Sequence, residues 1–274
     1  MKKICLTGMF PLLIGVTMTF CACNNKATST PVTFDKVAID TTVNLVPGDT
    51  ASPKAKINLT YTYAKGDKGD KGDNVKKINN YILSSNAFKS DLVNAYALEN
   101  LPPKEVVRKF VQEYIKEYRK TCGPLYAKDK TTHSCNYEFL SEGKVVNNGR
   151  YSCLTFNKYV YTGGANGMSS AITINVDRKT GEIITKDQLL KQISPSKTKQ
   201  EIVNSLVRQL KVKDFKQLHD SLYVFSDTTV YIPDNFRIGK DSITFIYGDL
   251  EIAPHYMGVL KAKVSKKDIQ MKPE

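Results

Sequence analysis

Alternating apolar and polar side chains predict a half-buried β-strand at residues 57–63. The apolar positions are Ile57, Leu59, Tyr61 and Tyr63, and the polar positions are Asn58, Thr60 and Thr62. A repeat of two residues is that of a strand, whose successive side chains point to opposite faces of a sheet. We expect an earlier strand within residues 32–46, ending at the turn formed by Pro47-Gly48-Asp49.

Spacings of three and four residues predict two helices in the following segment. Asp73 is placed to cap the first helix, in which three apolar residues share one face: Val75, Ile78 and Ile82. The second helix starts at Pro102-Pro103 and carries a stripe that we expect to pack in the core: Val107, Phe110, Val111, Tyr114, Ile115 and Tyr118. It should end before Gly123-Pro124, because proline cannot continue a helix.

The second half of the chain returns to a strand pattern with separate helical blocks. Asn147-Asn148-Gly149 is typical of a hairpin turn. Strands are expected at 151–161, 171–176, 236–238, 243–247 and 259–264, and helices at 187–193 and 198–211. Strands that pair locally and helices in blocks of their own predict an α+β fold, with antiparallel sheets and segregated helices. The length of the chain permits one large domain or two small ones.

The first residues are typical of a secretory signal. Lys2 and Lys3 precede an apolar stretch, and a small residue, Ala22, precedes Cys23. The segment Phe20-Cys21-Ala22-Cys23 is similar to a bacterial lipobox, which implies cleavage after residue 22, a lipid anchor on Cys23 and a tether over residues 23–31. An ordinary signal peptidase site, or modification of Cys21, remains an alternative. We expect a membrane-anchored lipoprotein outside the cytoplasm, most simply on the periplasmic face of an outer membrane.

Net charge limits the class of partner. The chain has a formal charge of +13, and removing residues 1–22 removes two lysines and no acid, which leaves +11. Nucleic acid is the common partner of so basic a chain, but a secreted protein does not meet it routinely. Besides the membrane that holds the lipid anchor, an anionic glycan, a peptidoglycan fragment or an envelope protein is the better candidate partner. Solubility alone explains the charge equally well.

The cysteines beyond the anchor suggest one disulfide. An oxidising compartment permits a bond, and Cys122 and Cys135 bracket a polar loop, so we favour this pair. Cys153 lies in an apolar strand pattern and is expected to be a buried thiol.

No motif of a known catalytic or cofactor site is present in the sequence. The three histidines form no paired metal-binding pattern. Neither a nucleophile elbow nor a phosphate-binding loop occurs. We therefore expect no metal, no cofactor and no enzymatic activity.

Two segments are candidates for ligand binding. In the first, Tyr161 precedes a glycine-rich turn whose free amides could meet a ligand; its candidate residues are Gly163, Gly164 and Asn166. In the second, an irregular connection carries His255 and Tyr256, residue types common at recognition surfaces. A structural turn is the alternative for the first segment, and a loop folded back on its own sheet is the alternative for the second.

The same two segments carry a family resemblance. The run Tyr161-Thr162-Gly163-Gly164-Ala165, followed by Asn175-Val176-Asp177 with Gly181-Glu182-Ile183, resembles the C-terminal domain shared by RsiV-like anti-sigma factors and PdaC-like proteins. Phe236, residues 243–247 and residues 251–258 continue the match in order, and the strand at Ile57–Tyr63 looks like the smaller domain that precedes it. The resemblance implies two small packed subdomains, a PdaC-like α+β domain at residues 32–160 and an RsiV-like α+β domain at residues 161–274. It also implies an extracytoplasmic module that binds or senses cell-wall molecules. Asn166, where a histidine is usual, and His255-Tyr256 depart from the family pattern in the segments that would bind.

These observations lead to one main hypothesis and two alternatives. The main hypothesis is a non-catalytic envelope lipoprotein that binds or senses a cell-wall or envelope component. The alternatives are an enzyme or accessory domain that acts on peptidoglycan or polysaccharide, and a structural or assembly partner in the envelope. An enzyme should show a deep pocket with two carboxylates or a histidine beside a carboxylate, and an assembly partner a large exposed apolar patch.

Overall fold

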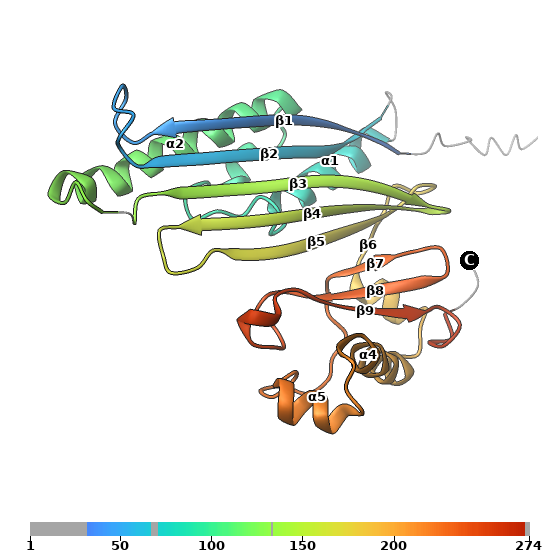
Figure 1. Ribbon diagram of the computed structural model, residues 1–274. Coiled ribbons are helices and arrows are strands. Elements are labelled where there is room, and N and C mark those ends of the chain that lie inside the picture. Colours follow the sequence, from blue (N-terminus) through green and yellow to red (C-terminus); the bar gives the residue numbers. More distant parts are fainter. Residues whose placement is uncertain (1–31, 67–70, 133, 272–274) are drawn as a thin grey trace, which may run out of the picture.

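The computed structural model describes residues 32–66, 71–132 and 134–271, and it places two β-sheets side by side (Figure 1). The larger sheet has six strands in sequence order. They are β1 (Thr33–Asn44), β2 (Lys54–Lys65), β3 (Tyr137–Asn148), β4 (Tyr151–Thr162), β5 (Met168–Asp177) and β6 (Ile183–Ile184). The hairpin turn expected at Asn147–Gly149 joins β3 to β4, and the α+β class is confirmed.

One pair of strands departs from the expected antiparallel arrangement. β2 and β3 are parallel, because the chain between them crosses one face of the sheet through α1 (Lys71–Ser84), the 3-10 helix η1 (Ala95–Leu98) and α2 (Pro103–Lys128). The larger sheet is therefore mixed. The helices cover one face, where Ile57, Leu59 and Tyr61 of β2 are buried, and leave the other face open (Figure 1).

The end of α2 differs from the prediction. The helix runs through Gly123 and Pro124 to Lys128, although proline removes one backbone hydrogen bond inside a helix. Cys122 and Tyr126 are buried on either side of Pro124. Packing of this last turn against the core offsets the lost bond, which local sequence preference does not reveal.

The smaller sheet is antiparallel and carries its own helices. Its strands are β7 (Phe236–Ile238), β8 (Ser242–Tyr247) and β9 (Leu260–Ser265). The surrounding helices are α3 (Lys186–Leu190), α4 (Pro195–Leu210), α5 (Phe215–Leu222) and the 3-10 helix η2 (His255–Met257). α4 packs on β9, where the hydroxyl of Ser205 donates to the carbonyl of Lys263 at 2.9 Å.

Two asparagine side chains join the sheets by hydrogen bonds to backbone amide and carbonyl groups, like those between paired strands. Asn175 of β5 donates to the carbonyl of Phe236 at 2.6 Å and accepts from the amide of Ile238 at 2.9 Å. Asn235, just before β7, accepts from the amide of Thr173 at 2.8 Å and donates to the carbonyl of Ala171. We call these two residues the asparagine seam. It holds β7 against the edge of β5, and with it the rest of the smaller sheet.

The hydrophobic core has two clusters that meet at this seam. One lies between the larger sheet and the helices α1 and α2. The other belongs to the smaller sheet but includes Tyr151 and Cys153 of β4. The larger sheet itself includes β5 and β6, beyond residue 160, where the sequence analysis divides the chain. Within the described ranges, no helix is both long and apolar enough to cross a bilayer.

Three cysteines are buried free thiols in this structure. The thiol of Cys135 lies 3.7 Å from the carbonyl oxygen of Cys122, to which it donates, so the end of α2 and the start of β3 are close together. Burial raises the pKa of the Cys122 thiol to about 12. The disulfide between Cys122 and Cys135 stays a prediction.

Candidate functional site

Polar side chains form rows across the open face of the larger sheet. Strand register places Asp40, Asn58, Leu140, Tyr159 and Ser169 opposite one another on β1 to β5. The next row is Thr60, Glu142, Asn157 and Ala171. These positions alternate with buried residues that face the helices, as the two-residue repeat of a strand requires. The open face therefore gathers hydroxyl, amide and carboxylate groups around one aromatic ring.

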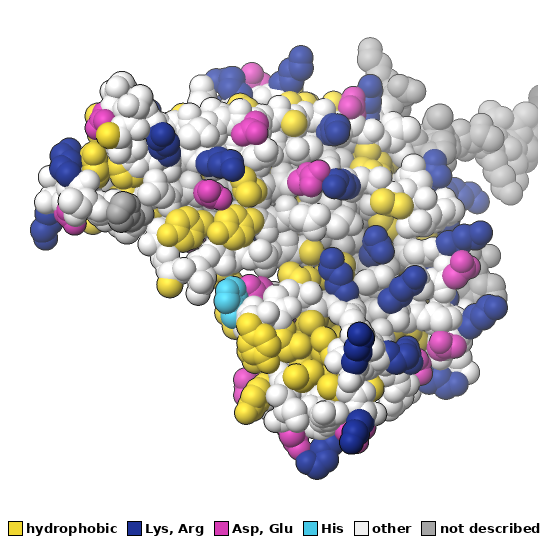
Figure 2. Space-filling model, viewed as in Figure 1, with side chains coloured by type: hydrophobic (Ala, Val, Ile, Leu, Met, Phe, Trp, Pro, Cys, Tyr) yellow, Lys and Arg dark blue, Asp and Glu magenta, His cyan; other side chains and the backbone are white. Residues whose placement is uncertain are grey.

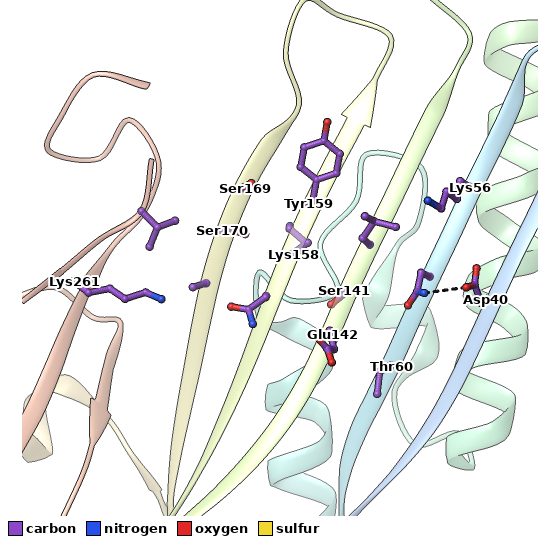
Figure 3. A pocket seen from close by; sticks show the side chains of 15 residues that line it. Asp40, Lys56, Thr60, Ser141, Glu142, Lys158, Tyr159, Ser169, Ser170 and Lys261 are labelled. Atoms are coloured by element: carbon purple, nitrogen blue, oxygen red, sulfur yellow. Dashed lines mark hydrogen bonds between the residues drawn. The ribbon is translucent and has the colours of Figure 1, made fainter. Parts of the chain in front are cut away.

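The two rows line a groove of about 630 Å³ that reaches the smaller sheet. Lys261 of β9 lies on its far side (Figure 3), and Val259, just before β9, also lines it. Figure 2 looks onto this face, which is hollowed between the two sheets and has hydrophobic side chains on both sides of the hollow. We call this the open-face groove. Its volume is in the range of ligand sites, but it is open to solvent and more polar than a typical small-molecule pocket.

The charged groups of the groove differ in whether they have partners. Asp40 accepts a hydrogen bond from the side-chain amide of Asn58 at 3.2 Å. Glu142 pairs with the ammonium of Lys144 at 3.2 Å. Lys56 and Lys261 are exposed and have no ion-pair partner among the residues that the structure describes. The groove thus presents two ammonium groups that are free to meet a ligand.

Some lining residues contribute only their backbone. The side chain of Lys158 points to the helical face, where its ammonium donates to the side-chain oxygen of Asn86 and the carbonyl of Lys89, both at 3.1 Å. Burial lowers the pKa of Lys158 to about 8. The hydroxyl of Ser141 likewise donates to the carbonyl of Ala87 at 3.1 Å on that face.

A glycine positions the aromatic ring of the groove. A Cβ atom on Gly167 would lie 2.3 Å from the ring of Tyr159, far inside van der Waals contact. The tyrosine therefore lies against bare backbone at the start of β5. Only glycine at position 167 permits this placement of the ring, which Figure 3 shows beside the connection from β4 to β5.

The six predicted binding residues do not line the groove, although two of them have neighbours that do. Tyr161 follows Tyr159 by two residues on β4 and so points to the same open face. Tyr256 lies three residues before Val259 and is 74% exposed. Their role in binding stays a prediction.

In the predicted glycine-rich turn, backbone geometry explains why one position is a glycine. Gly163 has a φ of +82°, and a Cβ there would lie 1.6 Å from the carbonyl oxygen of Ser134. Close backbone approach therefore explains this glycine. Nothing lies within 4 Å of a Cβ built on Gly164, so that position, like the exposed Asn166 beside it, has no such constraint.

His255 is held by a buried carboxylate. Its Nδ1 lies 2.8 Å from Asp249, whose side chain is 4% exposed, whereas that of His255 is 42% exposed. The pairing fixes the connection between β8 and β9, as does Glu251, which accepts from the backbone amide of Gly248 and the hydroxyl of Tyr231. These contacts hold the loop to itself and to Tyr231, and the side chain of His255 stays partly exposed.

Sequence reasoning missed the residues of the groove because they come from six strands of two sheets, β1 to β5 and β9. The signal that existed was the alternation at Asn58 and Thr60, which marks the polar face of β2. Which strands lie beside β2, and that Lys261 faces them, depends on the parallel pairing and on the asparagine seam. Among the described residues, no group of three or more histidine, cysteine or acidic side chains is placed to hold a metal ion.

Comparisons with known proteins agree with this two-part architecture. Residues 51–169 match the family model described as Deacetylase PdaC, and residues 182–267 match a family described as a protein of unknown function, DUF3298. No curated protein matches the chain.

Two solved structures share the fold. A DUF3298 family member from Bacteroides fragilis NCTC 9343 is 24% identical, with a TM-score of 0.73 over 87% of this chain and 92% of that one. A DUF3298 family protein from Pseudomonas aeruginosa PAO1 is 15% identical, with a TM-score of 0.53 over 89% of this chain and 95% of that one. At these identities the likeness concerns the fold alone.

Proposed function

We propose that this chain, in which a PdaC domain is followed by a DUF3298 domain, is a non-catalytic envelope protein that binds a glycan in its open-face groove. The observation that carries the proposal is the composition of the groove. Amides and hydroxyls from β2, β4 and β5 line the groove together with the single ring of Tyr159. A sugar chain offers the complementary groups, since its hydroxyls donate and accept hydrogen bonds and its C–H faces pack on aromatic rings.

The shape of the groove favours an extended ligand over a small one. It is open along the sheet, and its polar rows run across β1 to β5. Adjacent strands lie about 4.8 Å apart, so the rows extend well beyond one sugar ring. An oligosaccharide laid across the strands would contact both rows at once.

The state of the two groove carboxylates supports a binding role rather than hydrolysis. Glycosidases keep one carboxylic acid in a secluded, apolar setting so that it retains its proton. Asp40 and Glu142 are both exposed, and each already has a partner. The enzyme alternative remains testable, because two carboxylates do lie in the groove.

The proposed location is outside the cytoplasm, with the chain anchored to a membrane through Cys23. The signal, Cys23 and the tether lie outside the described residues. The support is the lipobox-like sequence. Mass spectrometry of the membrane fraction should find an acylated peptide that begins at Cys23, and an uncleaved chain in the cytosol would contradict this location.

Calorimetric titration of the full chain in mild detergent tests the binding role. The probes are a neutral tetramer of N-acetylglucosamine and soluble peptidoglycan glycan strands. Tyr159→Ala should weaken binding about tenfold, a loss of about 1.4 kcal/mol, as expected for an aromatic residue at the centre of a site. The matched control is Tyr96→Ala, which removes a 70% exposed ring far from the groove.

Two results would overturn this proposal. One is no binding of either probe by the wild-type chain, or equal binding by wild type and Tyr159→Ala. The other is release of new reducing ends from the glycan that Asp40→Asn or Glu142→Gln abolishes, which would establish the enzyme instead.

A further inference from the structure

The two unpartnered lysines of the groove, one from each domain, carry a further inference. Lys56 belongs to β2, within the PdaC match, and Lys261 to β9, within the DUF3298 match. In Figure 3 they lie on opposite sides of the groove, with β3, β4 and β5 between them. Both are exposed, and neither has an ion-pair partner among the described residues.

The acidic groups of the groove, unlike these two lysines, already have partners. Glu142 is the acid nearest the middle of the groove by register, and Lys144 already neutralises it. Asp40 lies at the β1 side and is hydrogen-bonded to Asn58. No acid of the smaller sheet lines the groove beside Lys261. The two lysine ammonium groups are therefore unpaired within the described ranges, whereas the carboxylate of Glu142 between them is paired with Lys144 and Asp40 lies outside them on β1.

We propose that the open-face groove selects glycans that bear anionic groups, and that Lys56 and Lys261 bind those groups from the two domains. This inference rests on the proposed glycan-binding function. The three strand spacings from β2 to β5 amount to about 14 Å, so a ligand that engages both lysines is an oligomer with acids on separated units. Such a ligand bridges the PdaC and DUF3298 domains.

Charge placed at the rim of an open site acts mainly on selectivity. Exposed ion pairs are weak and are screened by salt. We therefore expect each lysine to contribute about two- to fivefold in affinity for an anionic glycan and nothing for a neutral one. The preference for the anionic ligand should fall as ionic strength rises.

The test compares a neutral glycan with glycans that carry carboxylates or phosphates. One probe is the neutral N-acetylglucosamine tetramer. The second is a tetramer in which every other unit is N-acetylmuramic acid, which adds carboxylates to the same backbone. A third, the oligosaccharide core of lipopolysaccharide, carries phosphates. The full chain is titrated with each at low and high salt, as wild type and as Lys56→Gln, Lys261→Gln and the double variant.

Matched controls come from the same strands. Lys54 precedes Lys56 by two residues, and Lys263 follows Lys261 by two, so each shares a strand face with its test residue but does not line the groove. We expect Lys54→Gln and Lys263→Gln to bind every probe like wild type. Lys56→Gln and Lys261→Gln should each lose two- to fivefold for the carboxylate or the phosphate probe, and the anionic probe that is affected identifies the acid.

The outcomes distinguish failure of this inference from failure of the proposed glycan-binding function. If Tyr159→Ala weakens all probes but Lys261→Gln and Lys56→Gln leave anionic and neutral binding equal to wild type, the glycan site stands and the anionic selection is wrong. If the lysine controls lose as much as the test variants, the effect is general surface charge and the inference also fails. If Tyr159→Ala changes nothing, the proposed function itself fails.

Discussion

Removing the side-chain amide of Asn175 tests how the smaller sheet is held to the larger one. This residue is 2% exposed and satisfies three groups: the carbonyl of Phe236, the amide of Ile238 and the thiol of Cys153, at 2.6, 2.9 and 3.1 Å. Asn175→Ala leaves the two backbone groups of β7 facing a small cavity. An unsatisfied buried polar group costs about 1–3 kcal/mol, so for two such groups we expect a loss of about 2–6 kcal/mol from the free energy of unfolding.

The magnitude is large relative to the stability of a typical domain, about 5–15 kcal/mol. The lost hydrogen bonds lie at the junction of the two core clusters, so we also expect unfolding to become less cooperative. Urea unfolding followed by far-ultraviolet circular dichroism and by tyrosine fluorescence should give coincident transitions for wild type. In Asn175→Ala the smaller sheet should unfold first, and the two transitions should separate.

The matched control is Asn157→Ala, an exposed asparagine on the neighbouring strand. Surface substitutions of this kind change stability by about 0.5 kcal/mol or less. If Asn175→Ala has the same midpoint as Asn157→Ala and keeps coincident transitions, the asparagine seam does not hold the two sheets together and the reasoning is refuted.

Three further predictions concern single side chains. Gly167→Ala should push the Tyr159 ring aside and weaken glycan binding about as much as Tyr159→Ala. The control Gly164→Ala should bind like wild type, because no atom lies within 4 Å of a Cβ built there. Equal titration curves for the two glycine variants would contradict this. The pKa of Lys158 is lowered from 10.5 to about 8, so above pH 8 the unfolded chain binds more protons than the folded one. The free energy of unfolding should therefore rise by about 1–2 kcal/mol towards pH 9.5. In Lys158→Met the urea midpoint should not show this rise with pH. Refolding in glutathione disulfide should pair Cys122 with Cys135 and leave Cys153 reduced in the seam; peptide mapping that finds Cys153 in a disulfide would be evidence against this.

Local pattern predicted the elements of this fold better than their arrangement. The strand at Ile57–Tyr63, the hairpin at Asn147–Gly149 and the helix that begins at Pro103 follow from spacing and turn chemistry. The parallel pairing of β2 with β3 does not, because it depends on how two helices between them pack. The run of α2 through Pro124 was also missed, since tertiary burial of Tyr126 outweighs a local preference.

The candidate site was harder to predict for the same reason. Unusual residues in irregular segments drew attention to Gly163 and His255, and the structure gives both a local contact, with Ser134 and with Asp249. The groove is instead built from ordinary polar residues such as Asn157. These residues form a site only because of the strands that lie beside them. Nothing in the sequence brings Lys261 near Tyr159, because the asparagine seam sets that distance.

If one ligand spans both domains, the seam and the groove must be coupled. A glycan that reaches Lys261 needs β9 at its native distance from β5, which Asn235 fixes by bonding to Ala171 and Thr173. Asn235→Ala should therefore weaken an anionic tetramer more than a neutral one, since only the anionic ligand uses Lys261. The added loss should vanish in a Lys261→Gln background, where a double-mutant cycle would show the two changes to be non-additive. Equal loss for both ligands, or strict additivity, would contradict a coupling between the seam and Lys261.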